Sequence, residues 1–130
     1  MTDPLETTIA THLEAWNSPD GPERAKLIST VYSPDVVVAE PGATYRGHSG
    51  MDEAITGLQT QLPDTTITRT GPAQTAHDLV TYTWALGLAG RPPLATGRDV
   101  LIISDATTSD AATTTTTITA VYVLIDAPDS

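Results

Sequence analysis

The sequence predicts a single α+β domain over residues 1–130, with helices in the first half packed against a sheet built from the second half. The apolar residues repeat with a helical period up to Pro63 and alternate like strand residues from Thr65 onward. A chain of 130 residues fits one domain, and an apolar content of 39% is enough for a core.

Three helices are expected in the first half. The apolar residues that would share one helical face are Leu5, Ile9, Leu13 and Trp16 in the first helix, Leu27, Ile28, Val31 and Tyr32 in the second, and Met51, Ile55, Leu58 and Leu62 in the third. Pro22 suits the first turn of the second helix. Ser49 and Asp52 resemble a capping box at the start of the third.

Strands are expected at residues 36–39, 65–70, 79–88, 94–103 and 112–125. In the segment 79–88, Val80, Tyr82, Trp84 and Leu86 would share one face of the sheet. The loops between the later strands are short and rich in Gly, Pro, Asp and Ser, which predicts antiparallel neighbours joined by hairpins. Glu40-Pro41-Gly42 is a turn signal after the first strand.

Several strands carry apolar residues on both faces. In the run from Val100 to Ile103, Leu101 and Ile103 would point to one side, and Val100 and Ile102 to the other. The strands of a sheet with one solvent-exposed face would alternate between apolar and polar residues. Since helices cover only one face, we expect a second copy of the chain on the other, and therefore a homodimer through the sheet.

Composition excludes several classes of partner and chemistry. The net charge of −10 argues against nucleic acid and against an anionic membrane surface. There is no Cys, and His12, His48 and His77 lack metal-ligand spacing, so no metal site is expected. The sequence contains no Gly-rich phosphate loop, and no cofactor is expected. The polar, acidic first residues do not resemble a signal peptide, so we expect a soluble cytoplasmic protein.

Short motifs in a fixed order resemble a known family. Tyr32-Ser33-Pro34-Asp35-Val36-Val37 ends the second helix, Glu40-Pro41 follows, and Tyr45-Arg46-Gly47 precedes the third helix. This arrangement resembles the nuclear transport factor 2-like superfamily, and its SnoaL-like members most closely. The resemblance implies a cone-shaped, curved antiparallel sheet packed on the three helices and enclosing a deep pocket. Members of the superfamily include ketosteroid isomerases, polyketide cyclases, scytalone dehydratase and limonene-epoxide hydrolases, so the fold alone does not choose a function.

The resemblance implies two catalytic carboxylates. Glu40 resembles the carboxylate base of the ketosteroid isomerases, which is also followed by Pro. Asp99 resembles their second acid, which donates a hydrogen bond to an enolate oxygen, and apolar surroundings should raise its pKa. Those isomerases also use a Tyr on the first helix, where this chain offers His12 as a donor or proton carrier.

Trp16 and Trp84 are expected in the pocket wall, where large aromatic rings set the shape available to a ring-containing ligand. Further residues expected to line the pocket are Tyr32, Tyr45, His48, Leu101 and Tyr122.

Two hypotheses for function stay open. One is an isomerase, cyclase or lyase that uses no cofactor and acts on an apolar carbonyl compound by acid–base chemistry. The other is a non-catalytic protein of the same fold that binds an apolar ligand or acts as a homodimeric scaffold. An epoxide-hydrolase relay is disfavoured because Arg98 and Asp99 are adjacent and would point to opposite faces of a regular strand.

Overall fold

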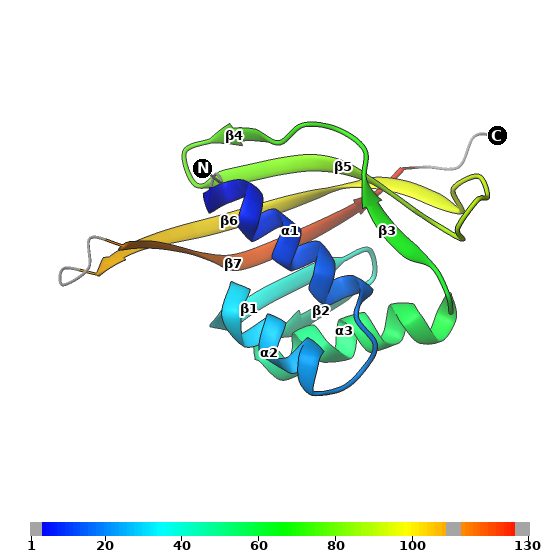
Figure 1. Ribbon diagram of the computed structural model, residues 1–130, viewed down its shortest axis with the longest axis horizontal. Coiled ribbons are helices and arrows are strands. Elements are labelled where there is room, and N and C mark those ends of the chain that lie inside the picture. The colour runs from blue at the N-terminus through cyan, green and yellow to red at the C-terminus, as the bar shows by residue number, and fades with distance from the viewer. Residues whose placement is uncertain (1–3, 109–112, 127–130) are drawn as a thin grey trace.

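The computed structural model describes residues 4–108 and 113–126. Its elements in chain order are α1 (Pro4–Asn17), α2 (Pro22–Val31), β1 (Tyr32–Glu40), β2 (Ala43–Arg46), α3 (Gly47–Gln61), β3 (Thr66–Arg69), β4 (Gln74–Ala76), β5 (Leu79–Gly87), β6 (Ala95–Thr108) and β7 (Thr113–Ile125). The three helices lie on one side of a curved, open sheet, and the predicted α+β class is confirmed (Figure 1). No helix among the described residues is long and apolar enough to cross a membrane.

The sheet is mixed, which corrects the expectation of a wholly antiparallel one. Its strand order is β2-β1-β7-β6-β5-β3, with β4 beside β5. The hairpins β5–β6 and β6–β7 are antiparallel as predicted, but β1 runs parallel to β7. No hairpin joins β1 to β7, so no local turn sets their relative direction. The sequence predicted neither β2, which pairs with β1 across the turn Pro41-Gly42, nor β4.

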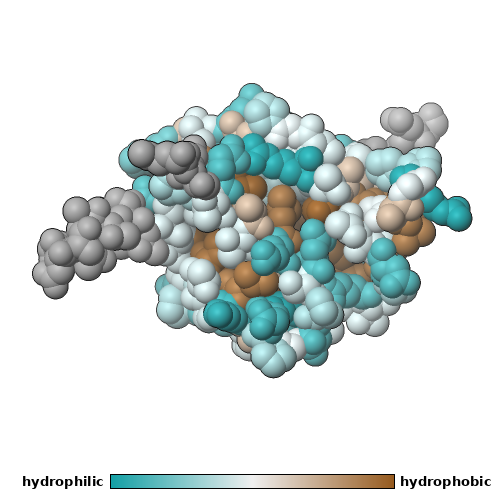
Figure 2. Space-filling view, in the orientation of Figure 1, coloured by the Kyte–Doolittle hydropathy of each residue, from teal (hydrophilic) through white to brown (hydrophobic). Residues whose placement is uncertain are grey.

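The core lies between α1, α3 and the inner face of the sheet. The predicted alternation in β5 is confirmed, since Val80, Tyr82, Trp84 and Leu86 are all buried. The helix α1 lies across the sheet and contacts β3 and β7, while α3 packs on β1 and β2. Figure 2 shows apolar residues as a band over and beside α1, bordered by polar residues.

The helices depart from the sequence analysis in two ways. Arg24 on α2 is fully buried, and the sequence analysis did not foresee this. Its guanidinium forms ion pairs with Asp20 and Asp52 and donates to the Thr56 hydroxyl of α3, so it joins the two helices. In addition, α3 begins at Gly47 with no side-chain cap, so Ser49 lies inside the helix and does not form the predicted capping box.

Candidate functional site

The inner face of the sheet and the helices α1 and α3 enclose a cavity of about 320 Å³. Most of its lining is apolar, and the acidic residues and histidine in it are His12, Glu40 and Asp99. Gly57 and Gln61 of α3, Pro41 after β1 and Ile125 of β7 line the cavity and are also exposed, so its mouth lies among these three chain segments. No Lys or Arg of the described residues lines it.

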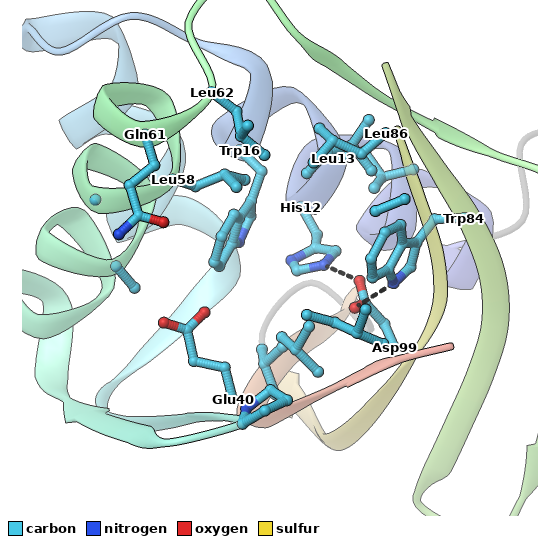
Figure 3. Close-up of a pocket in the computed structure, with 18 of the residues that line it drawn as sticks. His12, Leu13, Trp16, Glu40, Leu58, Gln61, Leu62, Trp84, Leu86 and Asp99 are labelled. Carbon is cyan, nitrogen blue, oxygen red and sulfur yellow. Dashed lines mark hydrogen bonds and ion pairs between the residues drawn. The ribbon is translucent and has the colours of Figure 1, made fainter. Parts of the chain in front are cut away.

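The Asp99 carboxylate is the centre of a buried hydrogen-bonded cluster. Strand alternation turns Asp99 to the inner face of β6, where it is 6% exposed. Its Oδ2 accepts from the Tyr82 hydroxyl at 2.8 Å and from His12 Nε2 at 3.0 Å. Its Oδ1 accepts from Trp84 Nε1 at 3.0 Å (Figure 3). Three donors therefore converge on one carboxylate.

Gly97 makes room for the Trp84 ring beside this cluster. Gly97 is the cross-strand partner of Trp84. A Cβ at Gly97 would lie 2.5 Å from Trp84 Cζ2 and 2.2 Å from the Leu124 carbonyl oxygen. The indole can therefore lie over Gly97 and reach Asp99, two residues along β6, only because position 97 has no side chain.

The substitution Gly97→Ala is expected to destabilise the fold by about 1–3 kcal/mol, because the Leu124 carbonyl belongs to the backbone and cannot rotate away. Gly57→Ala is the matched control: a Cβ at Gly57, inside α3, meets nothing within 4 Å. The control should gain about 0.5–1 kcal/mol from better helix propensity. Urea unfolding followed by tryptophan fluorescence measures both, and equal stability of the two variants would refute this role of Gly97.

His12 is buried between Asp99 and Tyr32 and is 1% exposed. The Tyr32 hydroxyl oxygen accepts from Trp16 Nε1 at 3.2 Å and contacts His12 Nδ1. The arrangement that satisfies every group has the Tyr32 hydroxyl donating to Nδ1 and Nε2 donating to Asp99. Burial, reinforced by the negative charge of Asp99, raises the pKa of Tyr32 well above its ordinary value, so Tyr32 stays a neutral donor.

Tyr82 is held neutral in the same way. Burial is the main cause that raises its pKa, and the charge of Asp99 and the hydrogen bond to it act in the same direction. The cluster therefore uses both tyrosine hydroxyls as donors, and one chain of hydrogen bonds runs from Trp16 through Tyr32 and His12 to Asp99.

Glu40 lies on the other side of the cavity from Asp99. The side chain comes from the last residue of β1 and extends into the cavity in Figure 3. Its carboxylate forms no hydrogen bond or ion pair with another described residue. It is half-buried, and the loss of hydration raises its pKa above the ordinary value of 4.5. Unlike Asp99, Glu40 is free to act on a bound molecule.

Of the remaining residues predicted for the pocket, Trp16, Tyr45 and Trp84 line it, whereas Tyr32, His48, Leu101 and Tyr122 lie outside its lining. Tyr32 lies behind His12, and His48 Nε2 donates to the Tyr32 carbonyl oxygen at 2.9 Å. Leu101 is fully buried in the core. Tyr122 is 45% exposed on the outer face of the sheet, because its neighbours Val121 and Val123 point inward.

Neither an Arg–Asp relay nor a metal site is formed by the described residues. Arg98 points away from Asp99 and donates to the Thr81 hydroxyl at 3.1 Å, as expected from strand alternation, so no Arg–Asp relay forms on one face. Within the part of the chain that the structure describes, no three His, Asp or Glu residues are grouped to hold a metal ion.

Sequence comparisons give no relatives: no family model matches the chain, and no curated protein matches it. Solved structures do match. A candidate isomerase of the SnoaL-like family from Agrobacterium tumefaciens has a TM-score of 0.79 at 19% identity, covering 95% of this chain and 98% of that one. A candidate polyketide cyclase from Sinorhizobium meliloti has a TM-score of 0.67 at 13% identity, covering 94% and 99%. An NTF2-like protein of unknown function from Exiguobacterium has a TM-score of 0.62 at 17% identity, covering 93% and 99%.

Proposed function

The chain has the nuclear transport factor 2-like fold found in SnoaL-like proteins, and from that premise we propose that its cavity binds an apolar carbonyl compound from which Glu40 removes a proton. The observation that carries this proposal is the half-buried Glu40 carboxylate, which lines an apolar cavity without a partner among the described residues. The names of the structural neighbours, a candidate isomerase and a candidate polyketide cyclase, are compatible with such chemistry.

Glu40 has the properties of a general base for a carbon acid. A raised pKa brings the strength of the base closer to neutral pH, where proton transfer is most efficient. The proton next to a carbonyl is the most acidic one on an otherwise apolar molecule. Its removal gives an enolate, which can be reprotonated at another carbon, giving an isomer, or can attack an electrophile, giving a ring. Neither outcome calls for a cofactor.

Asp99 has a positioning role in this proposal, in place of the proton-donor role expected from the sequence. With three donors on its two oxygens, it holds His12 and Trp84 in the cavity wall. These two rings and Trp16 then fix the width of the space in which a flat ligand would lie beside Glu40.

Proton abstraction can be tested without knowing the natural substrate. 2-Tetralone, an uncharged bicyclic ketone with acidic hydrogens, is incubated with the protein in D₂O, and deuterium incorporation next to the carbonyl is followed by NMR. We expect faster incorporation than in buffer alone, and a loss of that acceleration in Glu40→Gln. An acceleration that survives in Glu40→Gln would remove Glu40 from the mechanism.

A binding role without catalysis is the second candidate. It is favoured by the three hydrogen bonds that Asp99 already accepts, which leave Glu40 as the cavity's one carboxylate without a partner among the described residues. Saturable binding of 2-tetralone without deuterium incorporation would support this candidate over the enzyme.

We also propose that the protein forms a homodimer through the outer face of its sheet. Tyr122 and Leu124 are 45% and 53% exposed there, and the half-buried Val100 and Ile102 lie on the same face of the neighbouring β6. An apolar sheet face of this kind is more stable when a second copy covers it.

Tyr122→Glu is expected to convert the dimer into a monomer, because it would place a charge in the middle of the apolar face. Ala10→Glu, at an exposed site on α1, is the control that should remain dimeric. Sedimentation velocity measures both, and a parent protein that is monomeric at micromolar concentration would contradict the proposal.

A further inference from the structure

The polar groups that line the cavity fall into two sets. The first set is already hydrogen-bonded within the protein: His12, Asp99 and the indole nitrogens of Trp16 and Trp84. The second set consists of Glu40, the Tyr45 hydroxyl and the Gln61 amide, whose side chains form no hydrogen bond to another described residue. Every group of the second set can bind a ligand without first losing a bond inside the protein.

Tyr45 lies on the same part of the cavity wall as Glu40. It pairs directly with Val38 across the β1–β2 hairpin, and Glu40 is two residues further along β1 on the same inner face. Diagonal neighbours of this kind in an antiparallel pair have Cα atoms about 7–8 Å apart, which long side chains can bridge. Gly50 of α3 lies close against Tyr45, since a Cβ at position 50 would lie only 3.2 Å from Tyr45 Cβ.

Gln61 approaches the same space from the other side. It is the last residue of α3 and lies at the exposed mouth of the cavity. In Figure 3 its amide and the Glu40 carboxylate both extend into the space beside Trp16, away from Asp99. An amide offers both a donor and an acceptor, so it can bind a carbonyl or a hydroxyl oxygen.

We infer that Tyr45 and Gln61 bind an oxygen of an uncharged ligand beside Glu40, and that the cavity rejects ligands carrying a carboxylate or phosphate. The inference rests on the proposed function and deepens it by giving the ligand class and two specificity-determining residues. An anionic ligand would share the apolar cavity with Glu40 and Asp99, and no Lys or Arg of the described lining would neutralise it. A neutral ketone keeps its hydrogen bonds and adds no charge.

The test uses three probes with the same ring system: 2-tetralone, which carries a neutral carbonyl, tetralin, which carries no oxygen, and tetralin-2-carboxylate, which is anionic. Binding is measured at neutral pH through tryptophan fluorescence, because both Trp residues of the chain line the cavity. The variants are Tyr45→Phe and Gln61→Leu, which remove the polar groups and keep most of the volume. Their matched controls are Gln74→Leu, at an exposed site on β4, and Tyr122→Phe, which keeps the aromatic ring on the outer face proposed for the dimer, and both residues lie outside the cavity lining.

We expect each cavity variant to weaken 2-tetralone binding about three- to tenfold, as the loss of one neutral hydrogen bond predicts, and to leave tetralin binding within about twofold. The controls should bind 2-tetralone like the parent, and the carboxylate should bind at least about tenfold more weakly than the ketone. The inference is overturned if 2-tetralone does not bind, if neither cavity variant weakens it, if tetralin is weakened equally, or if the carboxylate binds as tightly as the ketone.

Binding and chemistry can fail separately in this design. If the probe pattern holds but no deuterium enters 2-tetralone, the ligand class stands and the proposed catalysis fails. If deuterium enters and depends on Glu40 while Tyr45→Phe and Gln61→Leu bind normally, the catalysis stands and this assignment fails.

Discussion

Glu40→Gln is expected to slow deuterium incorporation into 2-tetralone by about 10²–10⁴-fold, the usual contribution of a positioned general base. The amide has nearly the same shape as the carboxylate but cannot accept the proton. Glu53→Gln, at an exposed position on α3, is the control and should keep full activity. Equal rates for the parent and Glu40→Gln would refute the assignment of Glu40 as base.

The raised pKa of Glu40 gives this prediction a pH dependence. Activity requires the ionised carboxylate, so it should fall as the pH decreases through a pKa above the ordinary 4.5. The pH dependence of stability has the opposite sign to that of activity. Glu40 binds its proton more tightly in the folded state than in the unfolded state, so stability decreases as the pH rises from 4.5 through the folded pKa. At neutral pH, Glu40→Gln should therefore be at least as stable as the parent, and the two should converge below pH 4.5. Thermal unfolding across this range measures the difference.

Asp99→Ala is expected to destabilise the protein by about 3–5 kcal/mol, the range seen when one partner of a buried charged cluster is removed. The substitution leaves His12 Nε2, the Tyr82 hydroxyl and Trp84 Nε1 buried without their acceptor. Asp35→Ala, at an exposed site on β1, should change stability by less than about 0.5 kcal/mol.

Asp99→Asn provides a second, milder variant in case Asp99→Ala does not fold. It keeps the volume and one acceptor oxygen but turns an amide donor toward a neighbouring donor, so its stability should lie between those of the parent and Asp99→Ala. Urea unfolding at neutral pH measures the series. A loss below about 1 kcal/mol in Asp99→Ala would show that the cluster contributes little to the fold.

The parts of the site that the sequence predicted are those set by local periodicity. Alternation in β5 and β6 was enough to place Trp84 on one face and to turn Asp99 inward and Arg98 outward. Glu40 was predicted as a site residue from its resemblance to a known catalytic carboxylate, and it lies in the cavity lining.

The parts that were missed depend on contacts between distant segments. The parallel pairing of β1 with β7 leaves no signal in either strand. Residues on both faces of β7 are apolar, so alternation could not decide whether Tyr122 or Val123 faces the cavity. The burial of His12 had a readable signal, because it lies three residues after Ile9 and four before Trp16, on the buried face of α1. The place of Gln61 in the cavity lining had no such sequence signal, since a polar residue at a helix end is most often solvated.

The parallel pairing of β1 with β7 also has a consequence for the order in which the protein is made. The strand that carries Glu40 lies near the start of the chain, but it gains its partner β7 only when the last strand has left the ribosome. His12 and Asp99 are likewise 87 positions apart. Contacts between such distant positions slow folding, because a long loop must close before they form. The apolar faces of α1 and β1 therefore stay uncovered until β7 has been made, and the cavity can form only after that strand is available.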